Sequence, residues 1–362
     1  MFEKRPKLFK NRDVLSPLFV PDNLQDRKEE VEIISQYLGY ILDGATPPHL
    51  LIVGPTGSGK TVTTKYVIAE LKKHTKALIK YVTAEGTAYQ VATSIADTPR
   101  RGFGFMDVLD KIREKVQDRK AIFVLDEVDK MLGKDGDRLL YHLSREPNVC
   151  IIALSNRLTV MDMIDDPRVL SSFKPRKINF PPYNATQLIE ILSYRAEKAF
   201  NPGVLEDGVI ELCAALAAQR NGDARYALDL LGFAADIAIR NKQDKITEEN
   251  VRYAQDEVEV EFIRRSIAEL RENQKLLLYA VLTSNEKTPT RIYRAYNKLA
   301  RQYGINSLTQ RRLSQLLREL ELYGLVEIEI IGRGRGKGVR WLVTPSSTID
   351  DDVMLEAIRR SL

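Results

Sequence analysis

The chain has 362 residues, of which 44% are hydrophobic and 29% are charged, and its formal net charge is +5. This balance predicts a water-soluble protein of two or three domains, and the absence of any apolar run of about 18 residues excludes a membrane-spanning protein. Because no signal-like apolar stretch follows Met1, we expect a cytoplasmic location and no membrane partner.

The few cysteines and histidines argue against a disulfide scaffold and against a metal centre built from these residues. Cys150 and Cys213 lie among apolar residues, which predicts packing in a reducing compartment. His49, His74 and His142 share no spacing that is typical of metal ligands.

The first predicted elements surround a glycine-rich loop. Residues 1–20 form a polar, basic arm, and residues 24–42 alternate charged and apolar side chains with helical spacing. Residues 50–53 (LLIV) predict a buried strand, and residues 61–71 predict a helix. Between them, residues 54–61 read GPTGSGKT, which matches the phosphate-binding loop (P-loop) pattern G-x-x-x-x-G-K-[ST].

This loop predicts a site for a nucleoside triphosphate and Mg²⁺. Its glycines let several backbone N–H groups face one anion, and the start of the helix adds its positive end. Lys60 supplies a charge to the β- and γ-phosphates, and Thr61 offers its hydroxyl to Mg²⁺. The predicted nucleotide contacts in this loop are Pro55, Thr56, Gly57, Ser58, Gly59, Lys60, Thr61 and Val62.

Four more apolar runs of strand length follow the P-loop. Helical segments separate them, so we predict a parallel, doubly wound α/β sheet. The runs cover residues 78–82, 121–125, 149–154 and 177–180.

Residues 83–105 look like an insertion after the second strand. Its tip carries Arg100 and Arg101 beside two phenylalanines. Arginines and apolar wedges are the side chains that enter DNA minor grooves, so we predict a DNA contact at this tip. An ordinary surface loop is the alternative.

Polar side chains follow two of the predicted strands. Asp126 and Glu127 end the strand at 121–125, and Asn156 follows the strand at 149–154. Asp126 can hold Mg²⁺, as a Walker B aspartate does, and Glu127 can orient and deprotonate the attacking water. Asn156 can hydrogen-bond this water or the γ-phosphate. The alternative for Asn156 is a turn-forming asparagine. The alternative for Asp126 and Glu127 is a pair of solvated carboxylates at a strand end.

Strands stop at residues 181–184 (PPYN), where we place a domain boundary. Arg225 opens a helix beyond it and is predicted to reach the phosphates, with a surface salt bridge as the alternative. Arg168 precedes the boundary and is a candidate arginine finger for a neighbouring subunit, with a solvated arginine as the alternative. The predicted helices of this all-helical part are 185–199, 206–219, 223–240 and 247–263.

The last third of the chain predicts a winged helix-turn-helix. Eleven Lys and Arg occur against four Glu between Arg291 and Arg340. The third helix would read the major groove, and the glycine-rich tip would contact phosphates. A basic hairpin that binds protein is the alternative. The predicted helices are 266–283, 289–303 and 308–323, followed by strands at 325–331 and 339–343. Besides Arg100 and Arg101, the predicted DNA contacts are Gln310, Arg311, Arg312, Arg333, Arg335, Lys337 and Arg340.

Together these motifs resemble the archaeal origin-recognition and cell-division-control initiators, a branch of the AAA+ ATPases. The resemblance covers nearly the whole chain. It is carried by the P-loop, the Asp126-Glu127 pair, Ser155-Asn156, GDAR at 222–225, the helical lid and the winged helix, and by the stretches 14–27, 166–172 and 180–184.

The resemblance implies an AAA+ base at 1–183 with the insertion near 83–105, a helical lid at 184–264 and a winged helix at 265–362. It implies that Asn156 is sensor 1, Arg225 is sensor 2 and Arg168 is the box VII arginine. Further nucleotide contacts that it implies are Val20, Pro21, Arg27, Tyr183, Arg195 and Arg225.

The resemblance also implies a function. Members of this family hold ATP or ADP with Mg²⁺, hydrolyse ATP slowly as a switch, bind duplex DNA at replication origins and help load the replicative helicase. Paralogous initiator subunits are expected partners, and the location is nucleoid-associated. Three other functions stay open: a clamp-loader-like remodeller, a nucleotide-regulated transcription regulator, and an adaptor whose winged helix binds protein.

Overall fold

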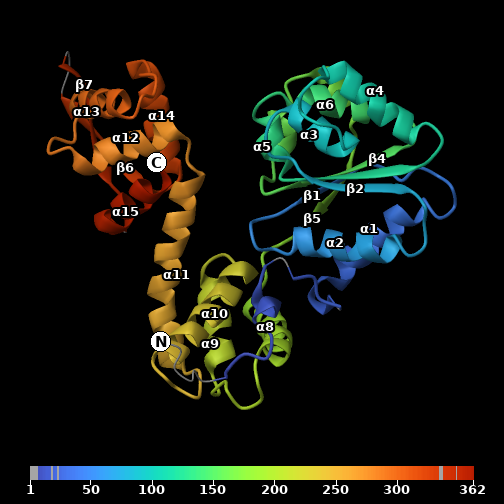
Figure 1. The fold of residues 1–362 in the computed structure, drawn as a ribbon, viewed down its shortest axis with the longest axis horizontal. Coiled ribbons are helices and arrows are strands. Elements are labelled where there is room, and N and C mark those ends of the chain that lie inside the picture. The colour runs from blue at the N-terminus through green and yellow to red at the C-terminus, as the bar shows by residue number, and fades with distance from the viewer. Residues whose placement is uncertain (1–6, 18, 23, 334–336, 348) are drawn as a thin grey trace. The chain divides into compact units, whose positions relative to one another are not determined.

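The computed structural model describes residues 7–17, 19–22, 24–333, 337–347 and 349–362, with the backbone alone at 330–333 and 337–340. The chain divides into two compact units, Met1–Ala254 and Gln255–Leu362, and each is described by itself (Figure 1). The first unit contains the sheet and the lid, and the second contains the winged helix.

The first unit is built on a five-stranded parallel sheet, as predicted, and the order of its strands is β2-β3-β4-β1-β5. All residues of β1, β3 and β4 are buried, which explains their continuous apolar sequences, because helices cover both faces. The strands are β1 (Leu50–Val53), β2 (Leu78–Thr83), β3 (Ala121–Asp126), β4 (Val149–Ser155) and β5 (Arg176–Asn179).

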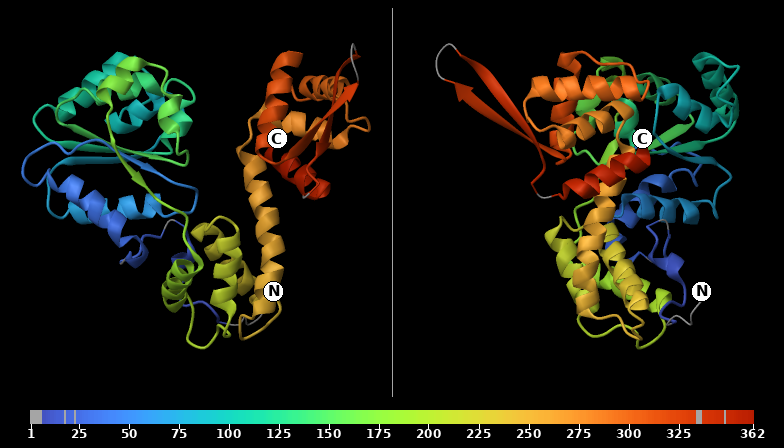
Figure 2. Two further views of the ribbon diagram at one scale, coloured as in Figure 1. Left: turned by 180° about the vertical axis from the view of Figure 1, so that it is seen from behind. Right: turned by 60° about the vertical axis from the view of Figure 1, so that its left-hand side comes forward.

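Alternate residues of the strands face two separate cores. Leu50 and Ile52 pack on the side of α1 (Lys28–Gly39) and α2 (Lys60–Leu71). The opposite face packs against the remaining helices of the base (Figures 1 and 2). These are α3 (Ala88–Ala96), α4 (Phe105–Val116), α5 (Val128–Leu132), α6 (Gly136–Leu143) and α7 (Pro167–Ser172).

The middle of the predicted insertion is helical. α3 begins with a capping box between Thr87 and Gln90 and buries an apolar face that includes Val91 and Ile95. Residues 84–87 and 97–104 are loops, and Arg100 and Arg101 are exposed in the second of them. No helix was predicted for this segment, although Val91, Ala92 and Ile95 recur at helical spacing and are buried on one face.

The lid consists of α8 (Ala185–Ala199), α9 (Val209–Gln219), α10 (Ala224–Arg240) and the first part of α11 (Glu248–Glu269), as predicted. The N-terminal segment (described at 7–17 and 19–22), which we assigned to the base, contacts this lid. Phe9 pairs with Phe200 in an antiparallel bridge, and the Lys10 N–H donates to the Ala199 carbonyl at 2.8 Å. This placement buries Val14 and Leu15, an outcome that local sequence does not encode.

The second unit has the predicted winged-helix order, with one error. The helix predicted at 266–283 is two helices, because α11 ends at Glu269 and Arg271 is extended (φ −68°, ψ 153°) as the N-cap of the next helix. The antiparallel β6–β7 hairpin forms the wing. Its elements are α12 (Glu272–Thr283), α13 (Pro289–Gln302), α14 (Gln310–Leu322), β6 (Val326–Arg333), β7 (Lys337–Pro345) and α15 (Asp351–Ser361), the last of which was not predicted.

Candidate functional site

The P-loop holds its lysine in a buried position. The Lys60 ammonium donates to the carbonyls of Gly54 and Pro55 at 2.8 Å and to Asn156 Oδ1 at 2.9 Å. The residue is only 6% exposed, and burial, followed by the charge of Arg225, lowers the pKa of Lys60 to about 8. A charged ammonium kept from water in this way favours an anionic ligand.

Two glycines let the lid and the base approach the loop closely. Gly57 (φ 73°) and Gly59 (φ 88°) have left-handed backbones. A Cβ atom on Gly57 would lie 1.8 Å from Asp223 Oδ1 of the lid, and one on Gly59 would lie 2.2 Å from Tyr183 Oη. The Ala224 N–H also donates to the Gly57 carbonyl at 3.3 Å. The first turn of α10 therefore rests directly on the phosphate-binding loop.

The two predicted magnesium ligands lie together. The Thr61 hydroxyl donates to Asp126 Oδ2 at 2.9 Å, and Tyr81 Oη donates to the same oxygen at 2.5 Å. Hydroxyl and carboxylate oxygens are the ligands that Mg²⁺ takes beside phosphate, so this pair fits the ion. Burial, followed by the charge of Asp126, raises the pKa of Tyr81 above its usual value, so the phenol stays a donor.

Glu127 stands at the end of β3 with a left-handed backbone (φ 58°). Its carboxylate pairs with the Lys130 ammonium at 2.8 Å, and Lys130 also contacts Glu85 at 2.6 Å. Burial opposes the charge of Lys130, but these two carboxylates raise its pKa overall. The predicted general base is thus present at the site and is restrained by a neighbouring cation.

A cavity of about 600 Å³ joins these groups, a volume typical of ligand pockets. The P-loop lines its polar side, together with Arg225 from α10. Its other walls include the apolar residues Pro21, Leu24, Ile191, Tyr194 and Leu228, which suit a purine ring and ribose.

Most of the predicted nucleotide residues line this cavity. They are Pro21, Gly57, Ser58, Gly59, Lys60, Thr61, Val62, Asp126, Glu127, Asn156, Tyr183, Arg195 and Arg225. Val20, Pro55, Thr56 and Arg27 are not among the lining residues.

Two of the predicted arginines hold the walls of the cavity. The Arg27 guanidinium lies 4.0 Å from the ring centroid of Tyr183 and donates to the Pro181 carbonyl at 2.5 Å. Arg195 donates to the carbonyls of Val14 at 2.7 Å and Phe19 at 3.0 Å, which ties the N-terminal segment to α8. Burial lowers the pKa of Arg195 to about 10.

Two carboxyl groups of the cavity wall escaped the sequence analysis. Asp26 precedes α1 and Glu190 lies on α8, and both line the pocket. Burial, and then the nearby Glu190, raise the pKa of Asp26 to about 6. No motif marks them, because they are 164 residues apart and meet only when the lid packs on the base.

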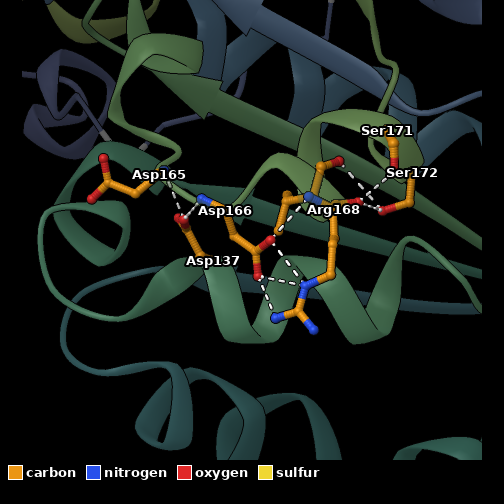
Figure 3. Close-up of polar contacts among 7 residues, drawn as sticks. Asp137, Asp165, Asp166, Arg168, Ser171 and Ser172 are labelled. Carbon is orange, nitrogen blue, oxygen red and sulfur yellow. Dashed lines mark hydrogen bonds and ion pairs between the residues drawn. The ribbon is translucent and has the colours of Figure 1, made fainter.

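Arg168 lies outside the cavity, on the exposed surface of α7 (Figure 3). Its guanidinium contacts both carboxylate oxygens of Asp166, with Nη2 at 2.7 Å from Oδ2. The hydroxyls of Ser171 and Ser172 donate to its backbone carbonyl. The side chain remains 69% exposed, so another protein molecule could reach it.

In the second unit, α14 presents the predicted basic residues to solvent. Gln310 and Arg311 are exposed, and Arg312 is half-buried, with a hydrogen bond to Gln315 at 3.0 Å. The Arg318 guanidinium lies 5.2 Å from the ring centroid of Trp341 on β7, which connects the helix to the wing.

The wing tip carries the other predicted DNA contacts of this unit. The backbones of Arg333, Lys337 and Arg340 lie in β6 and β7. Arg335 lies outside the described residues.

In the first unit, the loop at 97–104 is held from within. Tyr89 Oη donates to the carbonyls of Arg100 and Phe103, each at 2.9 Å. The exposed side chains of Arg100 and Arg101 therefore project from a braced backbone rather than from a free loop.

The cysteines are free thiols in apolar surroundings, and burial raises the pKa of Cys150 and that of Cys213 to about 12. Within the part of the chain that the structure describes, no helix has the length and apolar character needed to cross a membrane.

Three family models match successive parts of the chain. Residues 50–182 match the ATPase family associated with various cellular activities (AAA). Residues 189–256 match the Cdc6 AAA+ ATPase-type lid domain, and residues 265–353 match the CDC6 C-terminal winged helix domain. The order of the three matches is the order of the base, lid and winged helix.

Individual relatives match along almost the full length. An ORC1-type DNA replication protein of Methanothermobacter thermautotrophicus is 75% identical over 364 residues, covering 100% of both chains. One from Pyrococcus abyssi is 40% identical and covers 94% of this chain and 89% of its own. The solved structure of the Aeropyrum pernix ORC1 protein in complex with DNA has a TM-score of 0.86 at 33% identity, covering 99% of this chain and 98% of that chain.

Proposed function

This chain belongs to the family of archaeal ORC1-type DNA replication proteins, which are AAA+ ATPases, and on that premise we propose that it is an ATP-switched initiator of DNA replication. It binds duplex DNA at replication origins, is associated with the nucleoid, and helps to recruit or load the replicative helicase. The observation that supports the switch most directly is the contact of the lid with the P-loop, between Ala224 and Gly57.

Different residues of the pocket bind different parts of ATP. The P-loop amides and Lys60 bind the phosphates, while the apolar wall that contains Pro21 and Ile191 takes the base. Mg²⁺ held beside Thr61 and Asp126 supplies positive charge that offsets the charge of the triphosphate. Arg225 then contacts the terminal phosphate from the lid and couples the identity of the nucleotide to the position of α10.

Slow hydrolysis is proposed for the attacking-water site. Glu127 orients and deprotonates the water, and Asn156 steadies it beside Lys60. The ion pair between Glu127 and Lys130 competes with this task. A long-lived ATP state suits a switch better than a motor, since the state rather than the turnover is the output.

DNA binding is proposed for the exposed cations of both units. α14 enters the major groove with Gln310, Arg311 and Arg312, and the wing contacts the phosphates and the minor groove. Arg100 and Arg101 add a contact from the base. The solved complex of the Aeropyrum pernix ORC1 protein with DNA supports DNA binding as a function of this chain, without reference to particular residues.

Protein partners are proposed at the exposed Arg168 surface. A paralogous initiator subunit, or a second copy, would place its own nucleotide near this arginine, which then acts in trans. The replicative helicase is the second expected partner.

Two measurements test the proposal. Genome-wide footprinting should place the protein at replication origins, whereas sites confined to promoters would favour a transcription regulator. In vitro, Glu127→Gln should retain ATP and lose at least about 100-fold in hydrolysis, as expected for the loss of a general base. Unchanged turnover would exclude Glu127 from that role.

A further inference from the structure

We propose that Tyr81 is a positioning residue of the nucleotide site, whose hydroxyl fixes the Asp126 carboxylate in the orientation that Mg²⁺ binding requires. The inference rests on the proposed nucleotide-binding function of this pocket. Tyr81 belongs to no motif of the P-loop or of the strand that carries Asp126, and the sequence analysis did not single it out.

The parallel register of β2 and β3 places Tyr81 beside the end of β3. Tyr81 pairs with Val124, and Thr83 pairs with Asp126. Because successive side chains of a strand alternate between faces, Tyr81, Val124 and Asp126 all point to the face covered by α2. The Tyr81 ring packs in the core of that face, and its hydroxyl extends along the sheet to Asp126 Oδ2 at 2.5 Å.

Two donors on different elements anchor the same carboxylate oxygen. Thr61 reaches Asp126 Oδ2 from α2 at 2.9 Å, and Tyr81 reaches it from β2. The terminal torsion of an aspartate is broad, so a single donor leaves the carboxylate free to rotate. A second donor from another direction removes this freedom before the ligand arrives, which is the function of a supporting shell around a metal site.

The donor itself is braced by the helix that begins at the P-loop. The Lys65 ammonium lies 5.1 Å from the ring centroid of Tyr81, within the range of a cation–π contact. Lys65 and Thr61 lie one turn apart on α2. The orientation of Asp126 is therefore coupled to the placement of α2 through both of its donors.

The experiment compares Tyr81→Phe with the wild type in the full chain. The affinity for a fluorescent ATP analogue is measured in EDTA and over a Mg²⁺ titration, and bound Mn²⁺ is observed by electron paramagnetic resonance. We expect the affinity in EDTA to stay unchanged, because Lys60 and the P-loop are intact. The Mg²⁺ concentration for half-maximal effect should rise about tenfold or more, as expected for the loss of one hydrogen bond to a charged group.

A matched control is Tyr296→Phe in the second unit. The Tyr296 hydroxyl donates to Asn273 Oδ1, also at 2.5 Å, and the residue is fully buried. This variant removes a comparable hydrogen bond and should leave the Mg²⁺ titration at the wild-type position. Thermal denaturation of each variant verifies that it is folded.

The outcomes separate this inference from the proposed function. If the wild type binds no ATP analogue, the proposed function fails. If the wild type binds with Mg²⁺ and folded Tyr81→Phe gives the same Mg²⁺ and Mn²⁺ curves, the inference is overturned while the function stands. The inference would also be overturned if Tyr81→Phe lost as much affinity for the ATP analogue in EDTA as it does with Mg²⁺. Tyr81 would then support the pocket as a whole.

Discussion

In the first unit, Lys60 and Asp126 of the nucleotide pocket are buried and contact named partners, whereas the polar and charged residues at the start of α14 in the second unit face solvent. Lys60 and Asp126 are 6% and 9% exposed, and each makes at least two hydrogen bonds. Gln310 and Arg311 are exposed at the first turn of their helix.

The difference follows from the ligands that each region is proposed to bind. A nucleotide is small, so its affinity depends on donors that are already oriented when it arrives. DNA is a long polyanion, and its affinity comes from many exposed cations that displace counterions without a unique geometry. A single substitution should therefore weaken nucleotide binding strongly in the pocket, whereas one on the basic face should weaken DNA binding only moderately.

The largest expected effect is that of Lys60→Ala. Removing the buried ammonium should weaken ATP binding by about 100-fold or more, since charge-assisted contacts to phosphate are among the strongest. Calorimetric titration with ATP measures this loss. Lys72→Ala, at an exposed lysine just beyond α2, should bind as the wild type does. An affinity of Lys60→Ala within threefold of the wild type would contradict the pocket assignment.

The wing should respond less strongly. Replacing Arg335 and Lys337 together by alanine should weaken duplex binding about tenfold and lower the slope of log affinity against log salt by about two. Fluorescence anisotropy of labelled DNA measures both quantities. Trp341, the single tryptophan of the chain, gives an intrinsic signal beside the wing.

A control for the wing uses two other exposed cations of the second unit, Arg359 and Arg360 on α15. Their double alanine variant should leave the salt slope unchanged. An equal decrease in both double variants would show that the cations act only through net charge.

A smaller effect is expected from Asp26→Asn. The raised pKa of Asp26, about 6, means that the folded state binds this proton more tightly than the unfolded state does. The protonated Asp26 therefore contributes its full share to the free energy of unfolding below the ordinary aspartate pKa. This contribution is lost as the pH rises through about 6. After allowance for solvent screening, Asp26→Asn should gain about 1 kcal/mol at pH 7.5 and less at pH 5.

Urea unfolding at the two pH values measures this gain. Asp22→Asn is a control of opposite sign, because the hydrogen bond from Lys198 lowers the pKa of Asp22. Asp22→Asn should not increase the free energy of unfolding at pH 7.5. A loss of stability in Asp26→Asn at pH 7.5 would show that the Asp26 carboxylate is favourable there.

The smallest effect concerns Lys130. Its ion pair with Glu127 is partly exposed, and such pairs contribute only a few tenths of a kcal/mol. Lys130→Ala should free Glu127 and raise ATP turnover about twofold, whereas Glu85→Gln should lower it slightly by strengthening the remaining pair. Phosphate release at saturating ATP measures both. A tenfold decrease in Lys130→Ala would instead make Lys130 a required residue.

The motifs of the pocket could be predicted because their parts are adjacent in sequence. The P-loop, Asp126-Glu127 and Asn156 each stand directly after a strand, and parallel strands bring such ends to one edge of the sheet. The strands of the sheet could also be predicted. Strands that are buried on both faces are continuous apolar runs, because no face requires polar residues at alternate positions. The break before Arg271 was not visible, because apolar residues continue on both sides of it.

By itself, the sequence determined the fold class, the P-loop, the adjacent carboxylates Asp126 and Glu127 and the basic character of the C-terminal unit, all of which depend on local pattern and composition. Only the tertiary structure decided that Tyr81 donates a hydrogen bond to Asp126, that Asp26 faces Glu190, and that Phe9 and Lys10 of the N-terminal segment pack on the lid. These contacts join residues that are far apart in the chain, and they arise from strand order and lid packing, which no short stretch of sequence encodes.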